Sequence, residues 1–166
     1  MSKVVNAFIA LLVFSLLFGC INLNDTSLQK MATLQQKYFV TQSYSTSQIT
    51  MTDYITSLAD LRKTASGENV KIIESEIYLA ESFNYLNKTL SESTKVGYVN
   101  FNCSSKEAKL MINYITLAFN SINQAEETYN GLNSTQKEKL RVNYNDLLAG
   151  YKEQISNIKT YIETKC

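Results

Sequence analysis

Apolar residues recur at steps of three and four along most of the chain, a spacing typical of amphipathic helices. The pattern predicts helices over residues 68–94, 104–130 and 135–166. Their apolar stripes consist of Val70, Ile73, Ile77, Ala80, Phe83, Leu86 and Leu90 in the first of these, Ala108, Met111, Ile115, Ala118, Ile122, Ala125 and Tyr129 in the second, and Leu140, Tyr144, Leu147, Tyr151, Ile155, Ile158 and Ile162 in the third. Each helix therefore has one face suited to packing against its neighbours.

An earlier amphipathic stretch, residues 27–66, is less regular. Its apolar spacing fades through residues 41–47, where serine and threonine side chains compete for backbone hydrogen bonds, and it returns at Ile49. We expect a first helix that is bent, split in two, or extended beyond the others. Gly67 is suited to end it, because glycine readily adopts the left-handed conformation at a helix C-cap.

Capping signals mark the starts of the last two predicted helices. Ser104 with Glu107, and Thr135 with Glu138, have the spacing of a capping box. Short turns between long amphipathic helices predict an all-α fold, in which residues 27–166 form a single domain with the arrangement of an up-down-up-down four-helix bundle. The sequence has no proline and only five glycines, which suits long uninterrupted helices.

The first twenty residues follow a different pattern. Lys3 supplies a positive charge, and residues 7–18 form an apolar run that only Ser15 interrupts. This layout is typical of a secretory signal peptide. The run is shorter than the roughly 20 apolar residues that a membrane-spanning helix needs.

The end of this segment is Leu17-Phe18-Gly19-Cys20, which resembles the lipobox of prokaryotic lipoproteins. Leu17, Gly19 and Cys20 match the family pattern, whereas Phe18 stands where the family usually has a small residue. The resemblance implies that residues 1–19 are a lipoprotein signal peptide. It also implies cleavage before Cys20 and attachment of diacylglycerol to the thiol of that cysteine.

Residues 20–26 would then form a lipidated tether, and the helical domain would be exported and held at the outer face of the cytoplasmic membrane or cell envelope. Two alternatives stay open: an uncleaved anchor over residues 4–21, and simple secretion. All three place the domain outside the cytoplasm. With the anchor before the first of four helices, we expect residues 95–103 and the C-terminus near the membrane, and the turns at Gly67 and Gly131 away from it.

The chain has three cysteines. If Cys20 carries lipid, Cys103 and Cys166 are left as a pair, and an oxidising compartment favours their disulfide. The hairpin expected around residues 132–133 places these two cysteines at similar heights along antiparallel helices. The alternative is that they are two unrelated thiols.

Composition narrows the classes of function. The chain has 16 basic and 15 acidic side chains and no basic cluster, so we expect no nucleic-acid partner. It has no histidine, the commonest general base and a frequent zinc ligand. No carboxylate pair lies on a predicted apolar stripe, and no glycine-rich phosphate loop is present. We therefore expect no enzymatic activity, no metal and no cofactor.

Two further features bear on the surface of the domain. Four Asn-x-Ser/Thr sequons make these asparagines candidate N-glycosylation sites: Asn24, Asn87, Asn102 and Asn133. Two tyrosine pairs have seven-residue spacing and so share helix faces: Tyr78 with Tyr85, and Tyr144 with Tyr151. Such faces indicate either an aromatic-lined cleft for a small molecule or packing at the boundary of the core.

Together these features predict a non-enzymatic, lipid-anchored surface protein whose bundle acts as a binding or interaction module. Its partners would be the membrane, through the anchor, and an unidentified protein or small molecule. The alternative is an extracytoplasmic four-helix sensory or solute-binding domain. Because a lipid anchor cannot pass a signal inward, that alternative requires a transmembrane partner.

Overall fold

The computed structural model describes residues 26–40, 48–96, 102–141 and 143–166, and within these ranges it is helical with no strand. The helices are α2 (Thr26–Gln35), the π-helix η1 (Gln36–Val40), α3 (Gln48–Thr64), α4 (Asn69–Val96), α5 (Lys106–Asn130), α6 (Ser134–Lys137) and α7 (Tyr144–Lys165). The predicted all-α fold is confirmed for this part of the chain.

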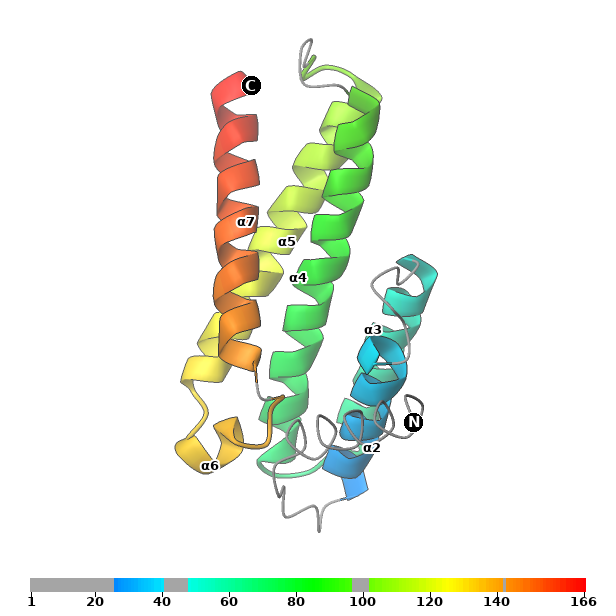
Figure 1. Ribbon diagram of the computed structural model, residues 1–166, viewed down its shortest axis with the longest axis vertical. Helices are drawn as coiled ribbons and strands as arrows, with labels where there is room; N and C mark the ends of the chain where they lie inside the picture. Colours follow the sequence, from blue (N-terminus) through cyan, green and yellow to red (C-terminus); the bar gives the residue numbers. More distant parts are fainter. Residues whose placement is uncertain (1–25, 41–47, 97–101, 142) are drawn as a thin grey trace, which may run out of the picture.

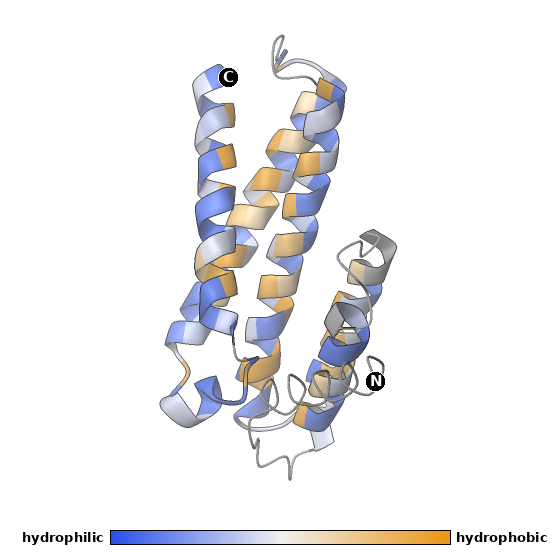
Figure 2. Ribbon diagram, viewed as in Figure 1, coloured by the Kyte–Doolittle hydropathy of each residue, from blue (hydrophilic) through white to orange (hydrophobic). Residues whose placement is uncertain are grey.

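Three long helices, α4, α5 and α7, run antiparallel along the longest axis (Figure 1). α5 lies between the other two: it packs extensively against α4 and also against α7, whereas α4 and α7 meet only sparsely. Figure 2 shows apolar residues concentrated where these helices face one another. The core of this part of the fold is therefore built around α5.

The apolar stripe predicted for α5 is buried. It consists of Ala108, Met111, Ile115, Ala118, Ile122 and Ala125, with Tyr129 half-buried at the end of the helix. Burying a large apolar side chain contributes roughly 1.5–3 kcal/mol. Regular spacing works well here because α5 presents one face to the core and the other to solvent.

The first predicted helix is split, as one of the expected alternatives had it. The rings of Tyr38 and Tyr54 lie 5.2 Å apart, so η1 and α3 run side by side, and α2 packs on α3 as well. The two segments form a helical hairpin that lies against the amino-terminal half of α4 (Figure 1). The all-α class holds, but the four-helix up-down arrangement is not confirmed.

Because the first predicted helix is split, the chain reverses direction once more than expected. The described part of the chain therefore begins at the opposite end of the fold from the one expected. Thr26 lies at the same end as the turns that contain Gly67 and Gly131, and the C-terminus lies at the opposite end (Figure 1). The anchor itself lies outside the described residues, so the expectation that these turns point away from it stays a prediction, although the described start of α2 lies at their end of the fold. Gly67 has φ +59°, the left-handed conformation expected of it, but it lies in the turn beyond the end of α3 at Thr64.

The last predicted helix is also interrupted. α6 is a single turn, and its capping box pairs Asn133 with Gln136, not Thr135 with Glu138. The Asn133 side chain accepts from the Gln136 backbone N–H at 2.9 Å, and the Gln136 side chain accepts from the Asn133 backbone N–H at 2.8 Å. Leu140 is buried beyond α6, and the chain enters α7 only at Tyr144.

The N-cap of α5 is displaced by one residue from its expected place. The hydroxyl of Ser105, not that of Ser104, accepts from the Ala108 backbone N–H at 3.1 Å. Both corrections have the same physical reason. Several neighbouring residues have side chains suited to capping, and the backbone geometry at the turn selects one of them.

Candidate functional site

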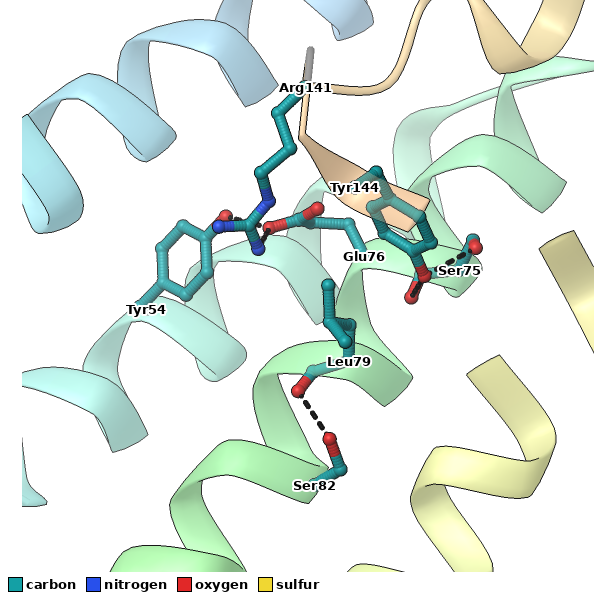
Figure 3. Close-up of polar contacts among 7 residues, drawn as sticks. All are labelled: Tyr54, Ser75, Glu76, Leu79, Ser82, Arg141 and Tyr144. Carbon is teal, nitrogen blue, oxygen red and sulfur yellow. Dashed lines mark hydrogen bonds and ion pairs between the residues drawn. The ribbon is translucent and has the colours of Figure 1, made fainter. Parts of the chain in front are cut away.

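The least expected feature of the core is a buried polar cluster where α3, α4 and the connection between α6 and α7 meet (Figure 3). The Tyr54 hydroxyl, on α3, donates to Glu76 Oε1, on α4, at 2.7 Å. The guanidinium of Arg141 donates to the same carboxylate oxygen. Tyr54 and Glu76 are both 0% exposed. Side chains from two other segments, α3 and the connection between α6 and α7, thus converge on one buried carboxylate of α4.

Charge pairing makes this burial tolerable. An isolated buried carboxylate is strongly unfavourable, and an opposite charge with additional hydrogen bonds offsets the cost. Burial lowers the pKa of Arg141, but the Glu76 carboxylate and the nearby tyrosines outweigh burial, so the pKa is raised overall. Burial, reinforced by the Glu76 charge, raises the pKa of Tyr54 well above its usual value. The cluster therefore contains a charged pair and a neutral tyrosine.

A second tyrosine extends the cluster to the start of α7. The Tyr144 hydroxyl donates to the Ser75 carbonyl at 2.6 Å and is hydrogen-bonded to the Ser75 hydroxyl at 2.7 Å (Figure 3). The Tyr129 ring stacks on Tyr144, with ring centres 5.3 Å apart. Burial raises the pKa of Tyr144. These contacts fasten the first turn of α7 to α4.

The surroundings of the cluster limit what it can do chemically. Tyr54, Ser75, Glu76 and Tyr144 are all buried, and only part of the Arg141 side chain reaches the surface. A general acid or base must come within hydrogen-bond reach of the substrate. The buried Glu76 carboxylate is out of hydrogen-bond reach of a substrate in solvent. We therefore assign the cluster the role of holding α3, α4 and α7 together.

A second candidate site is a groove between α4 and α7, with α5 beneath it, toward the end of the fold that carries the C-terminus. Its lining consists of Thr89, Leu90, Ser93, Met111, Asn157, Ile158 and Tyr161. The groove has a volume of about 200 Å³. Leu90 lies in this groove and is 42% exposed. Among the described residues, it is the large apolar side chain that is exposed to solvent.

The structure brings together the two cysteines that were expected to pair. The sulfur atoms of Cys103 and Cys166 lie 2.08 Å apart, at bonding distance. They connect the start of α5 to the end of α7. Cys20, the expected lipidation site, lies outside the described residues.

The sequons are dispersed. Asn87 is half-buried on α4, whereas Asn102 and Asn133 are exposed in turns. Both turn asparagines use their side-chain oxygen locally: Asn102 accepts from the Ser104 backbone N–H at 3.0 Å, and Asn133 caps α6. Asn24 lies outside the described residues. The structure does not gather these asparagines into a common site.

The tyrosine pairs serve mainly as packing. Tyr144 is buried in the polar cluster, and the Tyr151 ring stacks on Phe83 with ring centres 5.2 Å apart. Tyr78 and Tyr85 are half-buried against the core. Of the two interpretations of these faces, packing at the core boundary fits this arrangement.

Periodicity did not reveal Glu76 or Arg141 as members of a site. Glu76 lies off the predicted stripe of its helix, and Arg141 comes from the turn before α7. One signal was available: Glu74, Ser75 and Glu76 interrupt the apolar residues of the segment 72–80. A charge within such a segment indicates a buried partner elsewhere in the chain.

In the described ranges no group of three or more acidic or cysteine side chains is placed to hold a metal ion. No helix within those same ranges is both long and apolar enough to cross a bilayer. Comparisons with known protein families, with curated protein sequences and with solved structures give no match.

Proposed function

We propose that the protein is an exported, lipid-anchored protein of the cell envelope, whose helical domain acts as a non-enzymatic binding or interaction module. The observation that carries the anchor is the tetrapeptide ending in Cys20, which follows a short apolar run with a positive charge before it. A signal peptide of this form directs export.

The cysteine arrangement supports export. Disulfides persist in oxidising compartments and are rare in the cytosol. Cys103 and Cys166 lie at bonding distance, which leaves Cys20 as the third cysteine. This division of the three cysteines is the one that a lipidated, exported chain requires.

The distribution of polar groups supports binding over chemistry. The strongest buried polar cluster, around Glu76, is closed to solvent and holds helices together. The groove between α4 and α7, by contrast, is open, and the surface that its lining presents is mostly apolar. A concave, mostly apolar surface with few polar groups is typical of binding sites.

In this proposal the domain is a bundle of four elements. Three are the helices α4, α5 and α7, of which α5 runs antiparallel to the other two, and the fourth is the hairpin of α2 and α3. Thr26 lies at the end that carries Gly67 and Gly131 (Figure 1). A short tether from Cys20 to Thr26 would therefore hold that end close to the bilayer. The disulfide end, and with it the groove, would face outward toward partners.

A sensory or solute-binding role is the second candidate. The groove favours it, because a ligand held between α4 and α7 would contact two helices that otherwise meet only sparsely. Binding could then alter how these helices pack. Passage of a signal inward would still require a transmembrane partner protein.

Expression of the full chain and of Cys20→Ser in a bacterium that processes lipoproteins tests the anchor. Membrane fractionation, metabolic labelling with a fatty acid and intact mass are the readouts. We expect wild type to be labelled and membrane-bound, and Cys20→Ser to lose the label. The double variant Cys103→Ser/Cys166→Ser serves as control and should keep it. Wild type that retains residues 1–19 and takes up no label would refute the lipid anchor.

A further inference from the structure

We propose that the groove between α4 and α7 binds an uncharged, mostly apolar small molecule about the size of one aromatic ring. This deepens the binding role proposed above by naming the class of ligand, and it does not depend on the lipid anchor. The walls come from residues 89–93 of α4 and residues 157–161 of α7, and Met111 of α5 forms the floor.

The α4 wall presents mainly carbon atoms to the groove, although two of its side chains carry hydroxyl groups. The Thr89 hydroxyl donates to the Tyr85 carbonyl at 2.9 Å, and the Ser93 hydroxyl donates to the Leu90 carbonyl at 2.7 Å. Both donors are therefore used within the helix. What these side chains offer to the groove is mainly their methyl and methylene groups, beside the side chain of Leu90.

The charge of the lining selects against ionic ligands. None of the seven described residues that line the groove is charged. A charged ligand would lose hydration there without gaining an ionic partner, which is strongly unfavourable. The polar groups of the lining lie on the α7 side, at Asn157 and Tyr161. A neutral ligand with one hydroxyl or carbonyl group fits this asymmetry.

The floor and the size of the groove define the ligand further. Met111 is 3% exposed, and its flexible thioether side chain adapts to the shape of a bound group. The volume of about 200 Å³ is below that of sites for drug-sized molecules, roughly 300–1,000 Å³. An apolar cavity of about 150 Å³ is large enough for benzene. A single ring with a short substituent therefore matches the space.

A helix from a partner protein fits less well. Binding of a helix in a groove uses anchor residues at several successive turns. Each wall of this groove extends over about one helical turn, roughly 6 Å. That length accommodates one small group and leaves no place for a second anchor.

The methionines provide a direct test. Met111 lies in the groove, Met31 and Met51 are buried in the α2–α3 hairpin, and Met1 is the fourth methionine of the chain. We suggest methyl-labelling the methionines of the full chain in detergent micelles and titrating benzyl alcohol, benzoate and benzylammonium. These probes have similar size and differ in charge.

We expect benzyl alcohol to shift the Met111 methyl resonance in a saturable way and to leave Met31 and Met51 unchanged. Benzoate and benzylammonium should bind at least about tenfold more weakly, because their charge would be desolvated. No saturable shift of Met111 with benzyl alcohol, or equal binding of all three probes, would overturn the proposal. A Met111 resonance that moves with protein concentration alone would assign the groove to a second copy of the chain.

Two adjacent positions on α4 give a matched pair of variants. Ser93 lines the groove, whereas Thr94 is exposed and its hydroxyl likewise donates to a backbone carbonyl, that of Ser91, at 2.8 Å. Ser93→Leu fills the groove and should weaken binding of benzyl alcohol at least about tenfold, and Thr94→Leu should leave it unchanged. Equal affinity in the two variants would contradict the assignment. Leu90→Phe, at the exposed position of the lining, provides a second filled groove if Ser93→Leu alters the Met31 and Met51 resonances. Loss of the lipid label in Cys20→Ser bears on the anchor alone, so failures of the two proposals are distinguishable.

Discussion

Arg141 donates to Glu76 across 65 positions of sequence, linking the turn before α7 to the middle of the first half of α4. Glu76 is fully buried, and its Oε2 accepts no hydrogen bond from the described residues. The guanidinium is therefore the main compensation for a charge that solvent does not reach. Stability should depend on keeping the two partners together more than on the presence of either one.

Removing the guanidinium alone should be costly. Arg141→Met is expected to lower the free energy of unfolding by about 3–5 kcal/mol, because it leaves the Glu76 carboxylate buried without its cation. The double variant Glu76→Gln/Arg141→Met should recover a large part of this loss. Urea denaturation followed by circular dichroism measures both.

The matched control is the more exposed pair of Arg62 and Glu74, which also joins α3 to α4. Arg62→Met should cost about 0–1 kcal/mol, because an exposed ion pair contributes little. Similar losses in Arg62→Met and Arg141→Met, or a double variant at the buried pair that is no more stable than Arg141→Met, would contradict the assigned role of the cluster.

Two buried tyrosines should make the fold sensitive to alkali. Burial raises the pKa of both Tyr54 and Tyr144 above the usual value of about 10. The unfolded chain thus releases these protons at lower pH than the folded chain does. Their contribution to stability is complete below about pH 10 and is lost as the pH rises through the folded-state values.

We therefore expect the free energy of unfolding of wild type to fall above about pH 10, in step with the appearance of tyrosinate absorbance. Tyr54→Phe/Tyr144→Phe should be less stable at neutral pH, because it loses buried hydrogen bonds, but should show a shallower decline in alkali. Tyr114→Phe, at a half-buried position of α5, is the control and should retain the wild-type slope. A double variant with the wild-type slope would show that these hydroxyls do not govern the alkaline transition.

The part of the fold that periodicity predicts well is the part with one buried face. α5 packs on α4 and α7 with one side only, and the predicted positions from Ala108 to Ala125 are buried. α4 is different, because α3, α5 and α7 all contact it. Its predicted stripe misses Ser75 and Glu76, which are buried, and includes Leu90, which is exposed. Because α2 contacts α4 as well, this helix has four neighbours, and a helix so surrounded has no single apolar stripe for a sequence to display.

The candidate sites divide in the same way. The pairing of Cys103 with Cys166 could be predicted, because two antiparallel helices of similar length place the residues at their far ends at similar positions along the helix axes. The contact between Glu76 and Arg141 could not, since Arg141 belongs to a turn whose path depends on where α6 ends. The split of the first helix had only the serine- and threonine-rich residues 41–47 as its signal. Those residues predicted an irregularity without indicating a full reversal.

The position of the cap on α6 gives a direct comparison between sequence pattern and structure. Asn133→Ala should lower the free energy of unfolding by about 1 kcal/mol, because it removes the acceptor for the Gln136 backbone N–H. Thr135→Ala should change it by less than about 0.5 kcal/mol, as expected for an exposed position that does not itself supply the cap. Urea denaturation of the two variants decides between them, and a larger loss in Thr135→Ala would restore the capping box with Glu138.

The disulfide should stabilise the domain as a whole and the end of α7 in particular. It closes a loop between residues 63 positions apart, which in the chain-entropy model contributes about 4 kcal/mol. Cys103→Ser/Cys166→Ser should therefore lower the midpoint of urea denaturation.

In native-state hydrogen exchange, amides near Ile162 should lose protection first, since only packing then holds the last turns of α7 to α5. Amides around Met51 in the α2–α3 hairpin, remote from the bond, are the internal control and should lose only the share of protection that reflects global stability. Preferential loss at the hairpin would contradict the role assigned to the crosslink in holding the last turns of α7 to α5.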